Sequence, residues 1–204
     1  SLRAAQKNDM GVFIISPNDK GGMLYQAPEI LKDLTRPLSP MAFNALFCLR
    51  RPEIHTLSIG AARPEDFDEH VRTIGNIAEA GRILPPLEER LKTRWEQSLP
   101  EDWRNNWQEG LPHWSHAPGQ ANLREILRLH NLAMAFGLVE YGKMRYNLLG
   151  QGGHWFPGQS LGALTGDDLL PVLQKCADPK ESLRRLLAAR DLFAGEKKKR
   201  MSSA

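Results

Sequence analysis

Gly11-Val-Phe-Ile-Ile-Ser16 is the segment on which the predicted fold of the N-terminal part depends. It is a continuous apolar run rich in β-branched residues, and turn-forming residues bound it on both sides, at Asn8-Asp9 and at Pro17-Asn18-Asp19. Such a run is typical of a strand that is buried on both faces, as the strands of parallel sheets are. The sequence therefore predicts an α/β arrangement in this part of the chain.

Working outward, a second strand and two helices follow this first strand. Serine is a favourable N-cap and proline fits the first helical position, so Ser39-Pro40 predicts a helix that runs to about Arg50. Ile54–Ile59 is the second strand, and Pro64 begins another amphipathic helix, which we expect to stop at Gly81. Strands that alternate with helices form βαβ units with parallel strands. Two strands do not make a stable parallel sheet, so neighbouring strands are expected outside this chain.

After residue 85 the predicted elements are helical. Two segments have the form of a capping box, Asn122-Leu-Arg-Glu125 and Asp178-Pro-Lys-Glu181, and each predicts the start of a long helix. The sequence thus predicts an α/β part over residues 1–85, an all-helical domain over residues 86–195, and a basic flexible tail over residues 196–204.

The charge of the chain lies mostly in that tail. Lys and Arg number 27 against 24 Asp and Glu, a formal net charge of +3. Without Glu196-Lys-Lys-Lys-Arg200 the chain has 23 basic and 23 acidic residues. A neutral body argues against a broad nucleic-acid surface and against electrostatic docking on an anionic membrane. We therefore expect neither nucleic acid nor a membrane as a partner.

The expected compartment is the cytoplasm. No apolar run approaches the roughly 20 residues that a membrane-spanning helix needs, and the polar stretch Ser1–Met10 has no signal-peptide core. The two cysteines, Cys48 and Cys176, form no disulfide framework. A metal or cluster site built from His113, His116 and Cys176 is one open hypothesis.

The junction Ser58-Ile-Gly-Ala-Ala-Arg-Pro-Glu-Asp-Phe-Asp-Glu-His70 is the strongest chemical signal. A strand ends there, two small residues follow, and a helix starts. Exposed backbone N–H groups and the positive end of a helix suit a phosphate. The alternative, an ordinary loop between a strand and a helix, stays open on these residues alone.

Two ordered motifs resemble the aldo/keto reductase family over roughly residues 5–82. Gly11–Pro17 followed by Gly21-Gly-Met-Leu24 resembles that family's sixth barrel strand and its loop. Ser58–His70 resembles its seventh strand and cofactor loop. The resemblance implies that residues 1–85 are the C-terminal portion of a (β/α)8 TIM barrel. An eight-stranded barrel takes about 250 residues, so the resemblance also implies a missing N-terminal barrel half, in the same protein or in a separate chain.

The helical part resembles the ferredoxin-like extension that one branch of this family carries. Ala117-Pro-Gly119 leads into the capped helix at Asn122, and the stretch Tyr141–Asn147 also looks like the extension. The four cluster-ligand positions of that extension fall on Trp107, Gly110, His113 and Ala117, and its second motif falls near Cys176. A [4Fe–4S] cluster is normally held by four cysteine thiolates. The resemblance therefore implies a ferredoxin-like domain without an iron–sulfur cluster.

Carried over residue by residue, the resemblance implies an NADP or NAD site. Gly60, Ala61, Ala62 and Arg63 line the adenosine ribose-phosphate pocket, Asp66, Glu69 and His70 grip the adenine end, and Ser16, Asn18 and Lys20 approach the pyrophosphate. The family often has Arg or Gln at the position of Asp66, and an aspartate repels a 2′-phosphate. Arg63 can compensate, so the preference between NAD and NADP stays open.

The resemblance also implies which activity the complete protein has. Members reduce a small carbonyl substrate by hydride transfer from the nicotinamide, and a tyrosine acts as general acid. The catalytic tetrad of Asp, Tyr, Lys and His comes from earlier strands, so no catalytic residue is assigned in this chain. The alternative is a non-catalytic helical interaction module on a remnant of a barrel.

Overall fold

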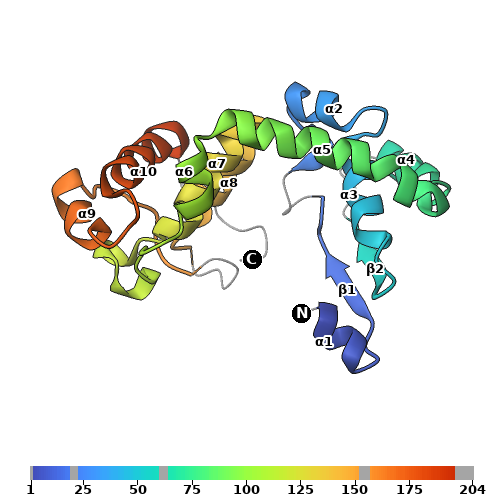
Figure 1. Ribbon diagram of the computed structural model, residues 1–204, viewed down its shortest axis with the longest axis horizontal. Helices are drawn as coiled ribbons and strands as arrows, with labels where there is room; N and C mark the ends of the chain where they lie inside the picture. The colour runs from blue at the N-terminus through green and yellow to red at the C-terminus, as the bar shows by residue number, and fades with distance from the viewer. Residues whose placement is uncertain (1, 19–22, 60–63, 152–156, 196–204) are drawn as a thin grey trace. The chain divides into compact units, whose positions relative to one another are not determined.

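The computed structural model describes residues 2–18, 23–59, 64–151 and 157–195. The chain divides into two compact units, Ser1–Arg94 and Trp95–Ala204 (Figure 1). The boundary falls within α5 (Ala80–Ser98). Lys20 and Gly60, Ala61, Ala62 and Arg63, five of the residues expected at the cofactor site, lie outside the described residues.

Unit 1 contains the parallel strand pair that the sequence predicts. β1 (Val12–Ile15) pairs in parallel with β2 (Ile54–Ser58) (Figure 1). Val12 lies opposite Ile54, and after a register shift Ile15 lies opposite Ser58. Among the described residues the sheet contains these two strands only, so they form no closed barrel. The predicted α/β part followed by a helical part is confirmed at this level.

The two faces of this sheet differ in burial. Val12 and Ile14, which lie opposite buried Ile54 and half-buried Leu57, are half-buried. On the opposite face, Phe13 is 60% exposed and Ile15 is 50% exposed. α3 (Pro40–Leu49), which begins at the predicted N-cap Ser39, packs against β2. The sheet therefore has one covered face and one open apolar face.

α4 (Glu65–Ile74) lies beside α3 and leaves its apolar side uncovered. Its stripe of Phe67, Val71 and Ile74 is exposed by 60%, 69% and 62%. The polar side is the one tied to α3, because the Ser39 hydroxyl donates to the Glu69 carboxylate. An amphipathic helix of a complete domain packs the other way round, with its apolar stripe toward a core.

The expected helix end at Gly81 is wrong. α4 ends at Ile74 with Gly75 as its C-cap, and α5 then begins at Ala80 and runs through Pro85 and Pro86. Prolines inside a helix remove backbone hydrogen bonds. Burial outweighs that loss, because Ala80 and Leu84 form a core cluster with Leu46 of α3.

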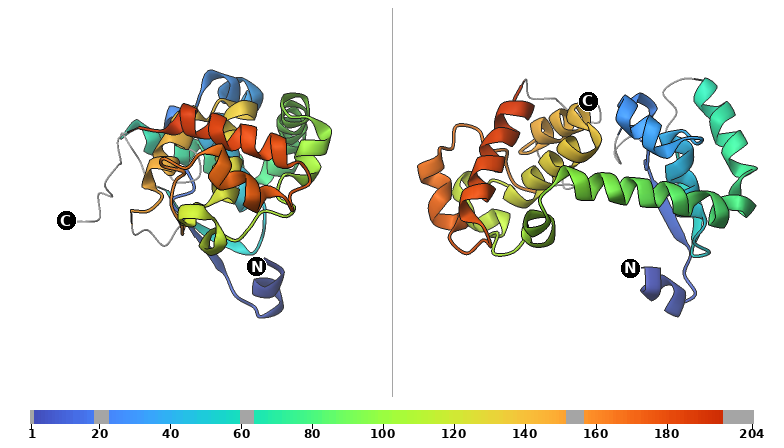
Figure 2. Two further views of the ribbon diagram at one scale, coloured as in Figure 1. Left: turned by 90° about the vertical axis from the view of Figure 1, so that its left-hand side faces the viewer. Right: turned by 45° about the horizontal axis from the view of Figure 1, so that its top comes forward.

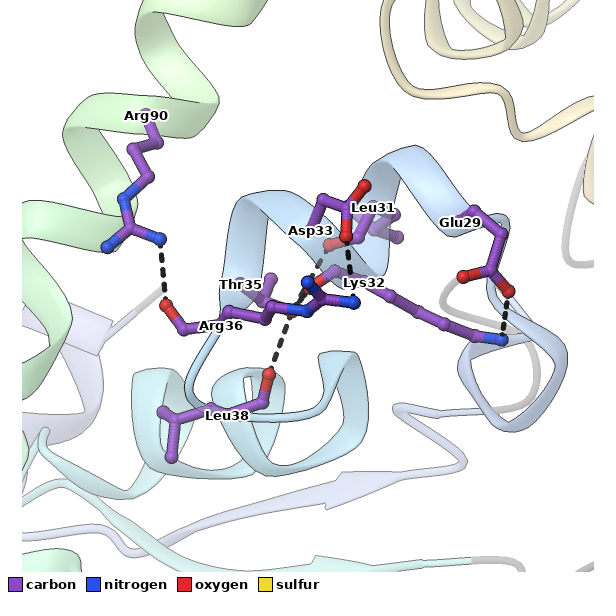
Figure 3. A network of polar contacts seen from close by, with 8 residues as sticks. All are labelled: Glu29, Leu31, Lys32, Asp33, Thr35, Arg36, Leu38 and Arg90. Atoms are coloured by element: carbon purple, nitrogen blue, oxygen red, sulfur yellow. Dashed lines mark hydrogen bonds and ion pairs between the residues drawn. The ribbon is translucent and has the colours of Figure 1, made fainter.

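A network around α2 (Glu29–Thr35) fixes the turn that leads into α3 (Figure 3). The buried Thr35 hydroxyl lies 3.1 Å from the carbonyl oxygens of both Leu31 and Leu38 and can donate to either. Arg90 of α5 donates to the Arg36 carbonyl at 2.7 Å. These bonds hold the chain just before Ser39, and so they position the start of α3.

Unit 2 is helical and has its own core. α7 (Leu123–Phe136), α8 (Val139–Leu148) and α10 (Pro179–Phe193) pack against one another (Figure 2). α9 (Gly166–Leu173) packs on α10, and α6 (Glu101–Asn106) precedes the three-helix core in the chain. The remaining short elements of the chain are α1 (Leu2–Lys7), η1 (Leu24–Gln26), η2 (Ile77–Glu79), η3 (Trp114–His116) and η4 (Pro118–Gln120). None of the described helices combines the length and apolar content that a membrane span requires.

The two predicted helix starts in unit 2 are confirmed, but in each capping box only the bond to the cap side chain forms, and the glutamate does not bond back to the cap. The Asn122 side chain accepts from the Glu125 N–H at 3.1 Å, and the Asp178 side chain accepts from the Glu181 N–H at 2.9 Å. The glutamate side chains form ion pairs instead, Glu125 with Arg128 and Glu181 with two arginines. A complete capping box occurs at Thr165 and Asp168, which start α9.

A substitution at Gly142 of α8 can test the packing of unit 2. A Cβ at this position would lie 2.4 Å from Cε1 of Phe193, whose ring is fully buried. We expect Gly142→Ala to lower the free energy of unfolding of unit 2 by about 1–3 kcal/mol, since overpacking forces the ring to shift. Tryptophan fluorescence during denaturant unfolding measures this, because all five tryptophans lie at or after residue 95.

Gly166→Ala is the matched control for this substitution. Gly166 also lies in a helix of unit 2, α9, but an added Cβ there meets only Cδ2 of Leu183 at 3.6 Å, an ordinary contact distance. We expect it to change stability by less than about 1 kcal/mol, in the stabilising direction. An unchanged fluorescence transition in Gly142→Ala would contradict the packing described here.

Candidate functional site

The candidate site lies at the edge of the sheet where both strands end. The Ser16 N–H donates to the Ser58 carbonyl at 2.8 Å, so the segment after β1 starts beside the end of β2. In α/β folds, ligands bind outside the carboxyl ends of parallel strands, because the loops that follow the strands meet there. The predicted residues Ser16 and Asn18 both follow β1 at this edge.

The backbone at this edge departs from ordinary strand geometry. Ser16 has a φ of 51° and Met23 has a φ of 52°, both in the left-handed region. The Leu24 N–H donates to the Asn18 carbonyl at 2.8 Å. Left-handed residues other than glycine are uncommon and cluster at ligand and active sites.

Asn18 is the most informative residue of the site. Its side chain is fully buried, and its Oδ1 accepts from Nδ2 of Asn44 at 3.1 Å. Its own Nδ2 has no hydrogen-bond partner among the described residues. A buried amide left without an acceptor costs about 1–3 kcal/mol, and a bound group that is absent from a structure is one reason for such an atom. Among the described residues this amide is thus a donor without an acceptor, which a ligand acceptor can satisfy.

Two residues of α4, Glu69 and His70, also belong to the predicted site. Glu69 accepts from the Ser39 hydroxyl, and both ring nitrogens of His70 are buried without a partner in the described part of the chain. Asp66 lies in the first turn of α4. Ser39 and Asn44 are five residues apart along α3, about 7.5 Å along its axis, so α3 contacts both Glu69 of α4 and Asn18, which follows β1.

The site therefore contains two residues that sequence reasoning missed. Ser39 was expected only as a helix cap, and its Oγ does accept from the Ala42 N–H at 3.0 Å. Asn44 carries no sequence signal, because its partner Asn18 is 26 residues away. Chemically, the described atoms offer an amide that can donate to a phosphate oxygen, a carboxylate that can accept from a hydroxyl group, and an imidazole that can do either.

In unit 2 two of the segments to which the resemblance assigns cluster ligands, those of Gly110 and Cys176, lie in contact. Gly110 has a φ of 71°, and a Cβ there would lie 1.8 Å from the Lys175 carbonyl oxygen. The segment of Gly110 therefore contacts the segment of Cys176 directly. His113 and His116 have ring centroids 6.1 Å apart, and the described residues contain no group of three side chains able to hold a metal ion.

Unit 2 also contains a cleft of about 580 Å³, whose lining includes Ala177, the residue after Cys176. Two indoles, the hydroxyl of Ser182 and three carboxylates line it, from the residues Trp103, Trp107, Asp102, Asp178 and Glu181. Burial raises the pKa of the Cys176 thiol, and the hydrogen bond with Ser182 only partly opposes that effect. A thiol that resists ionisation is a poor nucleophile and a poor metal ligand.

The chain was also compared with known proteins. No family model, no curated protein and no solved structure matches it.

Asn44→Ala tests the hydrogen bonding of the candidate site. It removes the described partner of the buried Asn18 carbonyl oxygen, so we expect the free energy of unfolding of unit 1 to fall by about 1–3 kcal/mol. Asn76→Ala, at a partly exposed position in the same unit where the side chain makes only a long, exposed bond to the Arg72 carbonyl, should change it by less than about 0.5 kcal/mol. Denaturation followed by circular dichroism compares the two. Equal effects would show that Asn18 needs no partner.

His130 of α7 makes the stability of unit 2 depend on pH. It is buried, and its burial, together with the charge of Arg185, lowers the pKa of the ring to about 4. The unfolded chain takes up this proton near pH 6.5, so unit 2 should lose up to about 3 kcal/mol as the pH falls from 6.5 to 4. His130→Gln should flatten that difference, whereas His116→Gln at an exposed position should retain it. Parallel curves for the wild type and His130→Gln would refute the assignment.

Proposed function

We propose that this chain is the C-terminal portion of an NAD(P)H-dependent oxidoreductase similar to the aldo/keto reductases. In this proposal the complete protein reduces a small carbonyl substrate by hydride transfer in the cytoplasm. The chain supplies part of the cofactor site and none of the catalytic tetrad. The tetrad belongs to the N-terminal barrel half, in the same protein or in a separate chain.

The observation that carries the proposal is the parallel strand pair with helices on one side. α3 packs on β2, α4 lies beside α3, and the opposite face exposes Phe13 and Ile15. In a (β/α)8 barrel the helices form a single outer layer, and the other face of every strand points into a packed interior. An apolar open face next to a one-sided helix layer fits a segment of such a barrel.

The residues at the strand ends fit the adenosine-phosphate part of a dinucleotide. The unpartnered Nδ2 of Asn18 can donate to a phosphate oxygen, and His70 offers an imidazole that no described residue engages. Arg63 and Lys20 supply cations by sequence. When bound, the cofactor supplies the hydride, and this chain would bind and orient its adenosine end.

Unit 2 supports the second part of the proposal, a ferredoxin-like frame without its cluster. The contact between Gly110 and the Lys175–Cys176 peptide joins the two segments that hold a cluster in such domains. Trp107, His113 and Ala117 occupy the other expected ligand positions. We therefore propose no iron–sulfur cluster and no metal in this protein.

Adenosine 2′,5′-bisphosphate tests the proposal on the chain itself. This probe needs only the adenosine end of the cofactor site, which is the part that the chain is proposed to carry. We expect it, or 5′-ADP if the cofactor is NAD, to bind to the 204-residue chain in calorimetric titrations. Arg63→Ala should weaken the 2′-phosphorylated probe selectively, since it removes the cation that neutralises the extra phosphate.

His70→Ala should weaken both probes, whereas His113→Ala, a substitution in the other unit, should weaken neither. The absence of any binding by either probe at millimolar concentration, with the chain cooperatively folded, would favour the interaction-module alternative. Binding that all three variants retain would place the nucleotide elsewhere on the chain.

A further inference from the structure

The cleft in unit 2 is a feature that the proposed function does not use. Its volume of about 580 Å³ falls in the range of sites that bind small organic molecules. The stretch of α6 contributes Trp103, Trp107 and Asp102 to its lining, and the start of α10 contributes Asp178 and Glu181. The two tryptophans are four residues apart in a helical stretch, so they lie on the same side of it. The cleft therefore combines aromatic surface with carboxylates.

The described residues do not neutralise the charge of this cleft. Those that line it include no lysine, arginine or histidine. Glu181 forms ion pairs with Arg184 and Arg185, at 2.6 Å and 2.7 Å. Asp102 and Asp178 form no ion pair with any residue in the described part of the chain. Two negative charges therefore remain in the lining.

Both of these aspartates also lie at helix starts, which offset part of their charge. Asp102 lies in the first turn of α6, and Oδ1 of Asp178 caps α10 by accepting from the Glu181 N–H at 2.9 Å. The N-terminus of a helix carries about half a positive charge, so two helix starts offset at most about one negative charge. The cleft therefore stays negative, and its carboxylates keep lone pairs for further donors.

Arg185 shows which kind of cation these residue types bind. Its Cζ lies 4.7 Å from the centroid of the Trp103 ring, and its Nε donates to Glu181 at 2.7 Å. A guanidinium suits this combination, because its flat face stacks on an indole while the N–H groups at its edge bond to a carboxylate. Trp103 and Glu181 both line the cleft, so part of the lining already holds a guanidinium of the chain itself.

We propose that the cleft binds the guanidinium group of a ligand, which stacks on the indole of Trp107 and donates to the carboxylates of Asp102 and Asp178. Trp107 is half-buried and both aspartates are exposed, so a ligand can reach all three side chains from solvent. The guanidinium belongs to a small guanidino compound or to an arginine of a peptide, which present the same group to the cleft. This site lies in unit 2 and does not depend on the proposed cofactor site in unit 1.

Calorimetric titration of the 204-residue chain with four probes tests the proposal. Agmatine carries the guanidinium on a small molecule, and Nα-acetylargininamide carries it on a peptide-like backbone. The lysine and citrulline counterparts of the second probe replace the guanidinium by an ammonium and by an uncharged urea. We expect the two guanidinium probes to bind, the lysine probe to bind at least about threefold more weakly, and the citrulline probe not to bind, since only a guanidinium offers both a flat face and a positive charge.

The first two probes distinguish the two sources of the group. Tighter binding of agmatine would support a small guanidino compound as the ligand, and tighter binding of Nα-acetylargininamide would support an arginine of a peptide. The absence of binding by both at millimolar concentration, with the chain folded, would overturn the proposal. Equal affinity for the arginine, lysine and citrulline probes would overturn it as well.

Substitutions that remove charge show whether the probes bind in this cleft. Asp178→Asn retains a good helix cap and Asp102→Asn retains the side-chain shape, so both should leave the circular dichroism spectrum unchanged. Each should weaken Nα-acetylargininamide about tenfold, because a charge-assisted hydrogen bond is lost. Trp107→Leu should weaken it about threefold through the loss of stacking.

Glu109→Gln is the matched control, because Glu109 is exposed and close in sequence to Trp107 but does not line the cleft. It should leave the affinity for both guanidinium probes unchanged. Wild-type affinity in both Asp102→Asn and Asp178→Asn would contradict the assignment to this cleft. An equal loss in Glu109→Gln would contradict it too, since the probes would then respond only to the net charge of the chain.

Discussion

Unit 1 depends on the parallel pairing of β1 with β2. The pairing aligns the two strand ends, so that the Ser16 N–H reaches the Ser58 carbonyl and the segments after both strands start at one edge. It also requires a crossover between the strands, and α3 provides the packed part of that crossover. The candidate site follows from these two constraints. With α3 in this place, Ser39 forms a hydrogen bond with Glu69, and Asn44 forms one with Asn18.

Much of this arrangement could be predicted because local chemistry determines it. The β-branched run at Val12–Ile15 and the Ser39-Pro40 cap predicted a strand and a helix that the structure contains. The end of α4 could not be predicted in the same way. The helical spacing of its apolar residues continues as far as Ala78. The chain nevertheless starts a new helix, α5, at Ala80, because Ala80 and Leu84 are buried against Leu46 there. Periodicity reports which residues share a face, and it does not report what that face meets.

The site shows the same limit for polar residues. Ser16 and Asn18 were assigned from the resemblance of their segment to a cofactor loop, whereas Asn44 was not assigned at all, because a hydrogen bond across 26 residues leaves no pattern in the sequence. In the capping boxes of α7 and α10, the bond to the cap side chain was predictable and the role of the glutamate was not. The cap is a local bond, but each glutamate has an arginine three residues on, and the ion pair with that arginine replaces the return bond to the cap.

The two units differ in how far each satisfies its own pattern. Unit 2 buries the apolar faces of its helices, and residues such as Leu127, Leu186 and Phe193 are fully buried. In unit 1, by contrast, the apolar stripe of α4 is exposed to solvent. This is so although α4 is more strongly amphipathic than α7 of unit 2. Since an amphipathic stripe is stabilising only when it is buried, the sequence of α4 encodes a contact that the described residues of unit 1 do not make. The bond from the Ser39 hydroxyl to Glu69 holds α4 by its polar side and leaves its apolar side exposed.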